Sequence, residues 1–260
     1  MVAILSNQRE VILECVRRMY TDVATEPGRG FHFPTGRAAC EFVGYPKEQL
    51  DAVPATALES FAGVGYPFAA AVIRQGDTVL DIGSGAGTDA LIASALVGAA
   101  GRVIGVDMTD AMRAKLRNNI AAVRATNIEV LEGNAEDIPL PNGCVDVVTS
   151  NGVLNLVPDK PRAIREMLRV LASGGRLQLA DIVVETLPSE ACRAKPELWA
   201  ECVVGATTLA AYVDEFSAAG LGDVEVINRV DYFSASSSSE TRKVAGSFGA
   251  HSIVLKGRKP

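Results

Sequence analysis

The 260-residue sequence contains no block of lysine or arginine, and its formal net charge is −6. A protein that neutralises nucleic-acid phosphates needs a basic patch, and anionic lipid surfaces attract one for the same reason. We find no cationic leader with an apolar core and a small-residue cleavage site. The longest weakly polar stretch, ALIASALVGAAG, is too short to span a bilayer. These absences predict a cytoplasmic protein that binds neither nucleic acid nor a membrane.

Paired cysteines are also missing. The five cysteines (Cys15, Cys40, Cys144, Cys192 and Cys202) form no C-x-x-C pair. Their odd number and wide spacing argue against both a disulfide framework and a zinc knuckle. We therefore expect no metal site, and the simplest role for a single cysteine in a reducing compartment is that of a small buried apolar residue.

What the sequence does contain, from about residue 77 onward, is an alternation of short β-branched runs with longer helical patterns. We predict strands at 78–83, 101–108, 128–134, 145–151 and 175–183, and helices at 87–98, 110–125 and 159–173. Such alternation is typical of a parallel sheet covered by helices on both faces.

The C-terminal part follows a different pattern. A predicted helix at 209–220 precedes two strand-like segments, 223–233 and 250–259, with no helix expected between them. The serine-rich patch at 234–240 is interpreted as a short polar loop. The fold class is therefore α/β: a doubly wound, Rossmann-like, seven-stranded and mostly parallel sheet with an antiparallel C-terminal hairpin.

The first 68 residues do not follow this alternation. The segment 7–24 is an amphipathic helix by its periodicity, and 28–50 has no regular pattern. We predict an N-terminal helical cap or lid at 1–68, lying over the ligand end of the sheet, and the main domain at 69–260. Simple packing of the N-terminal region against the main domain is the alternative.

The stretch VLDIGSGAGTD places Gly83, Gly85 and Gly87 between a strand and a helix, where ligands bind in doubly wound folds. The next strand ends in Asp107, twenty residues beyond Gly87. An acidic residue at this place accepts hydrogen bonds from the two hydroxyls of an adenosine ribose. Met108 follows and is expected to lie against the adenine. The pattern predicts an adenosine cofactor.

Asp81 indicates which adenosine cofactor is bound. It lies two residues before Gly83, and a carboxylate there opposes the pyrophosphate of a dinucleotide. S-adenosylmethionine has no phosphate and carries a sulfonium and an ammonium, so it suits an acidic strand tip. In EGNAEDIP, Ala135 and Glu136 are expected to place an amide and a carboxylate near the adenine edge.

The chain resembles a class I S-adenosylmethionine-dependent methyltransferase in the motifs VLDIGSGAGTD, GVDMT, EGNAEDIP, SNGVLNL and RVLASGGRL. In GVDMTDAM, SNGVLNLVPDK, ELWAECVVGA and FGAHSIVLKGRKP it resembles the arsenite methyltransferase branch. The resemblance implies that the cofactor is held by Asp81, Gly83, Gly85, Asp107, Met108, Ala135, Glu136 and Asn151. To these we add Ser84 and Gly87 of the glycine loop. The resemblance also implies that the backbone carbonyl of Asn151 faces the ammonium of the cofactor.

The same resemblance implies an acceptor site built from cysteine thiolates, soft ligands that match As(III). Of the three positions, this sequence keeps Cys202 and has Gly152 and Val64 at the other two. Trp199 lies three residues before Cys202, so the two share one face if the segment is helical, either as a substrate wall or as a core stripe. Tyr66 is expected near the methionine end of the cofactor or in the core.

No catalytic residue is assigned from the sequence. A general base, if one is needed, has two histidine candidates: His251, expected at the start of the last strand, and His32 in a glycine-flanked segment of the cap. A core role is the alternative for each. The leading hypothesis is a methyltransferase for a small metalloid or thiol-type acceptor. The alternatives are methyl transfer to oxygen or carbon of an apolar metabolite, or a non-catalytic cofactor-binding paralogue.

Overall fold

The computed structural model describes residues 6–193, 195, 199 and 203–260. Its strands are β1 (Thr78–Ile82), β2 (Arg102–Asp107), β3 (Ile128–Glu132), β4 (Val145–Asn151), β5 (Leu171–Val184), β6 (Thr207–Thr208), β7 (Gly222–Val230) and β8 (His251–Arg258). Its α-helices are α1 (Ser6–Thr25), α2 (Gly36–Phe42), α3 (Lys47–Asp51), α4 (Ala55–Leu58), α5 (Thr88–Val97), α6 (Asp110–Val123), α7 (Lys160–Val170), α8 (Glu190–Arg193), α9 (Leu209–Ala218) and α10 (Ser239–Phe248). Short 3₁₀ turns are η1 (Pro67–Ala70), η2 (Leu154–Leu156) and η4 (Tyr232–Ala235). Among the described residues, no helix is long and apolar enough to cross a bilayer.

The strands form one sheet in the order β3-β2-β1-β4-β5-β8-β7, with β6 pairing to β5 beside this path. The pairs from β3 to β5 are parallel, and β8 runs antiparallel to both β5 and β7. The predicted mostly parallel Rossmann-like sheet with an antiparallel C-terminal pair is confirmed. The sheet has eight strands and not seven, because the two-residue β6 pairs with the end of β5 at Val183 and Val184.

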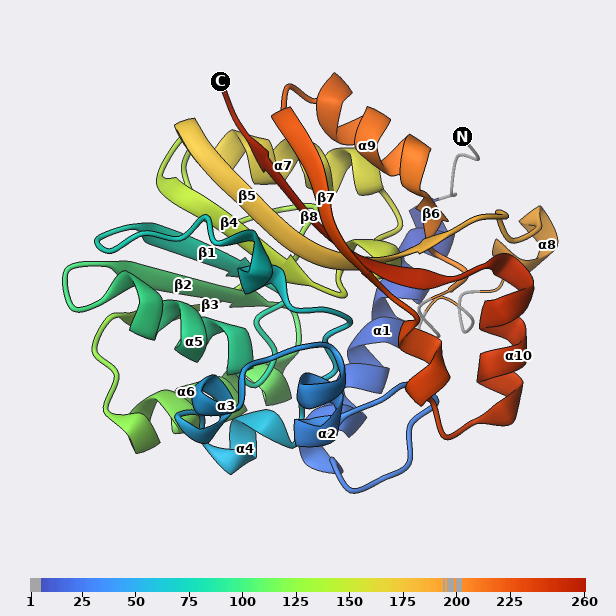
Figure 1. Ribbon diagram of the computed structural model, residues 1–260, viewed down its shortest axis with the longest axis horizontal. Helices are drawn as coiled ribbons and strands as arrows, with labels where there is room; N and C mark the ends of the chain where they lie inside the picture. Colours follow the sequence, from blue (N-terminus) through green and yellow to red (C-terminus); the bar gives the residue numbers. More distant parts are fainter. Residues whose placement is uncertain (1–5, 194, 196–198, 200–202) are drawn as a thin grey trace.

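Helices cover both faces of the sheet, and Figure 1 shows α5 and α6 on one side with α7 and α9 on the other. The alternation of side chains along β1 divides the core accordingly. Val79 packs in the cluster that contains α1 and α5, whereas Leu80 and Ile82 pack in the cluster that contains α7 and α9. Because both faces are buried, successive residues of β1 such as Val79 and Leu80 are both apolar, without the strict alternation of a half-exposed strand.

The C-terminal pair is not a direct hairpin. The prediction that no helix separates the last two strands is wrong, since η4 and α10 lie between β7 and β8. The serine-rich patch supplies the start of α10: the Ser238 hydroxyl accepts a hydrogen bond from Thr241 N at 3.1 Å and caps the helix. A run of serines indicates a loop by composition, but one serine in the right place begins a helix.

The predicted helix at 159–173 ends three residues early. α7 stops at Val170, and β5 begins at Leu171. The register between β4 and β5 shifts there, so that Val145 pairs with Leu171 and Val147 with Arg176. Gly174, at φ +75°, turns the chain within this irregularity.

The N-terminal region is more regular than predicted. The segment expected to be irregular contains α2 and α3, although the amphipathic helix at its start is found as α1. α2 buries Ala39 and Cys40, and α3 buries Leu50. Each of these helices is too short for periodicity to reveal it, because nucleation is costly and tertiary packing supplies the stability.

Candidate active site

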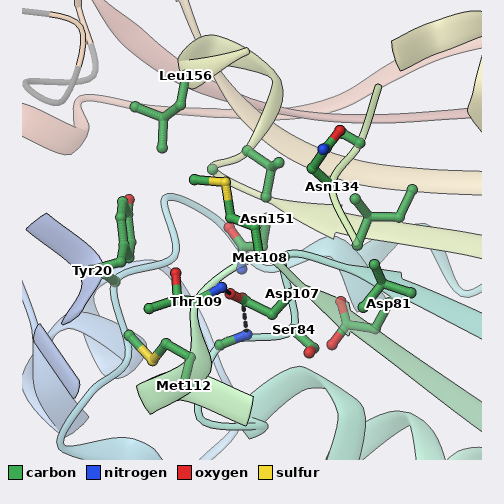
Figure 2. Close-up of a pocket in the computed structure, with 18 of the residues that line it drawn as sticks. Tyr20, Asp81, Ser84, Asp107, Met108, Thr109, Met112, Asn134, Asn151 and Leu156 are labelled. Atoms are coloured by element: carbon green, nitrogen blue, oxygen red, sulfur yellow. Dashed lines mark hydrogen bonds between the residues drawn. The ribbon is translucent and has the colours of Figure 1, made fainter. Parts of the chain in front are cut away.

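A pocket of about 1000 Å³, its open mouth included, lies at the carboxyl ends of the parallel strands. This is where ligands bind in doubly wound sheets. We call residues 81–89, 106–109 and Met112 the strand-tip wall, and Leu13, Val16, Tyr20 and 60–63 the N-terminal wall. Figure 2 shows side chains of both walls, with Tyr20 and Asp81 on different sides of the same space. Residues 133–136, 151–153, Leu156 and Val157 complete the lining.

The glycine loop is shaped by backbone conformation and by close packing. Gly83 and Gly87 have φ values of +70° and +100°, which favour glycine. A side chain at Gly87 would strike Leu116 of α6, and one at Gly83 would strike Val153. Gly83, Ser84, Gly85 and Gly87 therefore form the predicted turn into α5, and all four line the pocket.

Asp107 is held at the tip of β2 by backbone donors. Its Oδ2 accepts a hydrogen bond from Gly85 N at 2.9 Å, and its Oδ1 accepts one from Thr109 N at 2.8 Å. Arg113 donates to the Asp107 carbonyl at 3.0 Å. Burial raises the pKa of Asp107, while the backbone donors and Arg113 oppose this rise. The carboxylate is thus fixed against the glycine loop with lone pairs left for a ligand.

Two buried polar atoms of the strand-tip wall have no hydrogen-bond partner among the described residues: Asp81 Oδ2 and Ser84 Oγ. Burial raises the pKa of Asp81 well above its ordinary value, and the charges of Asp89 and Asp107 raise it further. A buried carboxylate oxygen without a donor is costly unless a ligand supplies one. The wall is therefore suited to a ligand that carries donors or positive charge.

Glu136 lies in the lining, but both of its carboxylate oxygens are already engaged. Oε2 accepts a hydrogen bond from Arg9 Nε of α1 at 2.6 Å and is paired with the guanidinium, and Oε1 accepts one from Asp159 N at 2.8 Å. The side chain therefore joins α1 to the start of α7. Its place at the adenine edge stays a prediction, and the structure adds that both oxygens are bonded to the protein.

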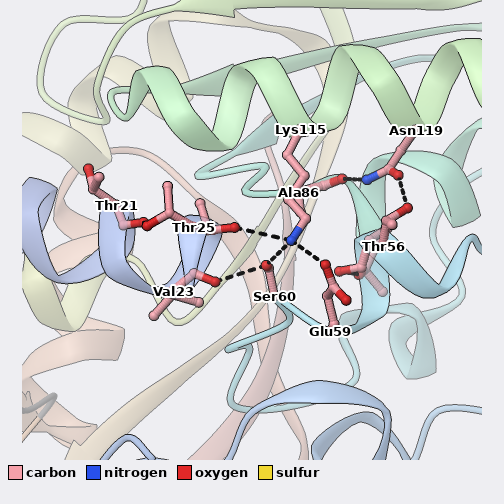
Figure 3. Close-up of polar contacts among 12 residues, drawn as sticks. Thr21, Val23, Thr25, Thr56, Glu59, Ser60, Ala86, Lys115 and Asn119 are labelled. Atoms are coloured by element: carbon pink, nitrogen blue, oxygen red, sulfur yellow. Dashed lines mark hydrogen bonds and ion pairs between the residues drawn. The ribbon is translucent and has the colours of Figure 1, made fainter. Parts of the chain in front are cut away.

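The other end of α1 is fixed by Lys115 of α6, as Figure 3 shows. Lys115 Nζ donates to Ala24 O at 3.1 Å, to Ser60 Oγ at 2.8 Å and to Glu59 Oε1 at 2.6 Å. Ser60 in turn donates to Val23 O at 2.9 Å. A cation at the carbonyl end of a helix also complements the helix dipole. α1 thus has a network of contacts at its C-terminal end and one ion pair near its N-terminal end.

Asn151 lies at the tip of β4, as predicted, and lines the pocket. Its side chain bonds to the protein: Oδ1 accepts from Val64 N at 2.8 Å, and Nδ2 donates to Gly65 O at 2.9 Å and to Asp89 Oδ2 at 3.0 Å. Only its backbone groups are left to face a ligand, which agrees with the atom assigned from the sequence.

Gly152 and Val64 are neighbours in space. Gly152 has a φ of +71°, and a Cβ placed on it would lie 3.2 Å from Val64 Cγ1. Gly152 lines the pocket and Val64 is buried behind it. These two positions, which the resemblance assigns to one acceptor site, are therefore in apolar contact, and Gly152 is the one that faces the pocket.

The structure does not bring the other described substrate candidates to the pocket. Tyr66 donates its hydroxyl proton to Gln49 Oε1 at 3.1 Å and packs against Tyr45. His32 packs edge-on against the Phe33 ring, and its carbonyl accepts a hydrogen bond from Ser236 Oγ at 2.7 Å. Trp199 is buried with Lys160 Nζ 5.2 Å above its ring. Cys202 lies outside the described residues.

His251 likewise begins β8, with Nδ1 3.0 Å from Gly249 O, and does not line the pocket. The structure adds groups that the sequence analysis did not name: Asp89, the Tyr45 hydroxyl that contacts it, and the individual residues of the N-terminal wall. Asp89 could have been identified from its position two residues after Gly87. Nothing in the sequence around Tyr45 indicates its contact with Asp89.

A family model described as a methyltransferase domain matches residues 73–238, which include the whole strand-tip wall. The chain belongs to the methyltransferase domain family. The predicted methyltransferase resemblance is therefore confirmed.

Relatives support the narrower resemblance of this methyltransferase domain. An arsenite methyltransferase of Halobacterium salinarum is 37% identical over 230 residues, 87% of this chain and 57% of that protein. The ubiquinone/menaquinone biosynthesis C-methyltransferase UbiE of an Enterobacter species is 43% identical over 109 residues, 40% of this chain and 42% of that protein. The chain spans about half of the length of the arsenite methyltransferases it matches, 57% and 43% for those of H. salinarum and Aquipseudomonas alcaligenes.

Among solved structures, the arsenic(III) S-adenosylmethionine methyltransferase CrArsM of Chlamydomonas reinhardtii superposes with a TM-score of 0.61 at 28% identity. The match covers 86% of this chain and 74% of that one. This methyltransferase domain is therefore arsenite methyltransferase-like in sequence and in fold.

Proposed function

We propose that this protein transfers a methyl group from S-adenosylmethionine to a small-molecule acceptor. Metalloid and thiol-type compounds are the leading acceptor candidates. The observation that carries this proposal is the charge of the pocket. Four carboxylates line it (Asp81, Asp89, Asp107 and Glu136), and of the described residues that do so none is a lysine, arginine or histidine. Such a site favours a sulfonium and an ammonium and disfavours a pyrophosphate.

The residues present fit this cofactor. Asp107 has lone pairs available for the two ribose hydroxyls, and Met108 and Met112 supply apolar surface for the adenine. The free oxygen of Asp81 and the backbone carbonyl of Asn151 are the acceptors for the ammonium. Ala135 lines the pocket beside Glu136, so the adenine edge meets the backbone there and not the Glu136 carboxylate.

When bound, S-adenosylmethionine supplies an electrophilic methyl group. The chain's own contribution is alignment and shelter, since an in-line displacement depends on both. The N-terminal wall is apolar except for Tyr20 and Ser60, and it excludes water from the side opposite Asp107. We further propose that residues 1–68 form a cap, because this wall comes entirely from them.

The acceptor proposal rests on the lack of a histidine base among the described residues that line the pocket. Neither His32 nor His251 reaches the pocket, and the carboxylates of the strand-tip wall are engaged by the cofactor in this proposal. Soft nucleophiles such as thiolates, selenides and metalloid species need little proton removal at neutral pH, whereas alcohols and carbon acids need a base. Cys202 is the one soft ligand that the sequence offers for such an acceptor.

One observation favours a second candidate, methyl transfer to oxygen or carbon of an apolar metabolite. The contact between Gly152 and Val64 makes the acceptor side apolar, and no thiol of Cys15, Cys40, Cys144 or Cys192 lines the pocket. The resemblance to a C-methyltransferase over 109 residues agrees with this candidate.

Calorimetry with S-adenosylmethionine and with NAD tests the cofactor: we expect binding of the first and none of the second, and the reverse would refute the proposal. Incubation with methyl-labelled cofactor and a panel of As(III), selenite, sulfide, small thiols and phenols tests the acceptor. Label on As(III) that survives Cys202→Ser would remove the role given to that thiol. Label on phenols alone would favour the second candidate, and label on none would favour a non-catalytic binder.

A further inference from the structure

The side chain of Asn151 holds a segment of the N-terminal region through that segment's backbone. Oδ1 accepts hydrogen bonds from Val64 N at 2.8 Å and Gly65 N at 3.2 Å, and Nδ2 donates to Gly65 O at 2.9 Å. An amide that bonds both the N–H and the C=O groups of two successive residues fixes their backbone as a neighbouring strand does. The segment is 86 residues away in the sequence, so this is a tertiary contact that joins two parts of the pocket.

Asp89 and Tyr45 hold that amide in turn. Asp89, in the first turn of α5, accepts from Asn151 Nδ2 on one oxygen and from the Tyr45 hydroxyl on the other. Asn151 Nδ2 also lies 3.0 Å from the Tyr45 hydroxyl. Tyr45 is buried among the rings of Phe61 and Tyr66, whose centroids lie 5.3 and 4.8 Å away. With these partners the amide has one orientation.

The held segment has no room to shift. A Cβ on Gly63 would lie 2.5 Å from Asn151 Nδ2, and one on Gly65 would lie 2.6 Å from the Ala180 Cβ. Val64 stands between them, fully buried, and its methyl group faces Gly152. The distance between Val64 and Gly152 is therefore fixed by the position of the Asn151 amide.

We propose that Tyr45, Asp89 and the Asn151 side chain are positioning residues that hold Val64 against Gly152, a lining residue of the pocket, and thereby select acceptors by size. The inference rests on the proposed methyl transfer, since that proposal places the acceptor on the Gly152 side of the pocket. None of the three side chains needs to touch the acceptor. They act through the backbone of Val64 and Gly65.

The ionisation of Asp89 affects the assembly formed by Tyr45, Asp89 and the Asn151 side chain. Burial raises its pKa to about 6, and the hydrogen bonds from Tyr45 and Asn151 oppose the rise. The other titratable groups that face it are Asp81 of β1, the Cys40 thiol of α2 and Tyr66, and burial raises the pKa of each of them. At neutral pH Asp89 is therefore the charged acceptor that two donors require.

Tyr45→Phe tests the proposal, because it removes the hydroxyl and keeps the ring. The matched control is Tyr212→Phe, which removes another buried tyrosine hydroxyl that donates to a buried aspartate, Asp181, at 2.6 Å, outside this assembly. Loss of one hydrogen bond to a charged group corresponds to about a tenfold change in an opening equilibrium. We expect amide hydrogen exchange at Val64 and Gly65 to become about tenfold faster in Tyr45→Phe and to stay unchanged in Tyr212→Phe.

The second readout is selectivity, which a merely structural loss does not move. With methyl-labelled cofactor, we expect the rate for thiophenol relative to 2-mercaptoethanol to rise about fivefold in Tyr45→Phe, a size expected of one altered pocket contact. Val64→Ala should shift the ratio in the same direction with Tyr45 intact.

Unchanged exchange in Tyr45→Phe, or equal acceleration in both variants, would overturn the positioning role. Faster exchange with an unchanged acceptor ratio would overturn the selection of acceptors. Failure of the wild-type protein to bind S-adenosylmethionine would instead refute the proposed function, and the exchange experiment would still decide the positioning role.

Discussion

The strand-tip wall of the pocket presents three buried carboxylates, whereas the N-terminal wall across from it presents mostly apolar side chains. The first wall comes from two strand ends, one glycine loop and the helix that follows, in a stretch of 32 residues from Asp81 to Met112. The second is assembled from one face of α1 and the segment 60–63. One wall is a local product of the chain, and the other depends on tertiary contacts.

This difference between the walls fits the binding of two ligands, a cofactor and an acceptor. A cofactor that is the same throughout a family can be bound by a local motif, because backbone N–H groups and one acidic strand end suffice. An acceptor that differs between relatives needs a surface that changes without disturbing that motif. The N-terminal wall meets this need, because it is held to the sheet by a few side chains such as Asn151, Lys115 and Glu136.

The largest effect should come from the strand-tip wall. We expect Asp107→Ala to weaken S-adenosylmethionine binding about a hundredfold, because two hydrogen bonds to a charged acceptor are lost, at about 1.5 kcal/mol each. Calorimetry measures this, and Asp110→Ala is the matched control, since Asp110 is a nearby aspartate whose side chain is 93% exposed. Similar losses in both variants would mean that net charge, and not the geometry of Asp107, governs binding.

The strand-tip wall could be predicted from the sequence, whereas the contacts that hold the N-terminal wall could not. Asp107 is found from its distance to Gly87, and the strands and α5 from short-range periodicity, because backbone hydrogen bonding makes these local. The Arg9–Glu136 pair joins residues 127 apart, and Tyr45 meets Asp89 across 44. No periodicity encodes such contacts, so neither the bonds that engage Glu136 nor the contact of Tyr45 with Asp89 could be predicted.

The same reasoning explains the errors in the fold. α10 was missed because its start looks like a serine-rich loop, and its stability comes from burying Ala245 against the core. α2 and α3 are too short to show a period. His32 was predicted to lie over the ligand because phenylalanines flank it. In the structure the rings of Phe31 and Phe33 stack on each other, and His32 does not line the pocket.

An intermediate effect should come from pH, which acts on the carboxylates of the strand-tip wall. Burial raises the pKa of Asp89 to about 6, and that of Asp81 is raised as well. Asp89 therefore becomes protonated as the pH falls through about 6, and its attraction for a cationic ligand is lost. For one such group, lowering the pH from 7.5 to 5 weakens binding about tenfold.

Titration calorimetry at several pH values measures this, with adenosine as the control ligand because it carries no positive charge. We expect the affinity for S-adenosylmethionine to fall with decreasing pH and that for adenosine to stay nearly constant. An equal fall for both ligands would show that the fold, and not charge, responds to pH.

The smallest effect should come from the N-terminal end of α1, and it sharpens the comparison between the two walls. Arg9 and Glu136 form one partly exposed ion pair, with the Arg9 side chain 29% accessible, while Lys115 makes three contacts at the other end of the helix. Pairs of this kind contribute up to about 1 kcal/mol, so Arg9→Met should speed dissociation of labelled S-adenosylmethionine about threefold to fivefold. Chase experiments in low and high salt measure the dissociation rate, and the wild-type rate should approach that of the variant as salt screens the pair.

The control is Arg17→Met, which removes an exposed pair with Glu14 on the same helix and should leave the rate unchanged. If both variants accelerate dissociation alike, α1 responds to its own stability and not to its link with the pocket.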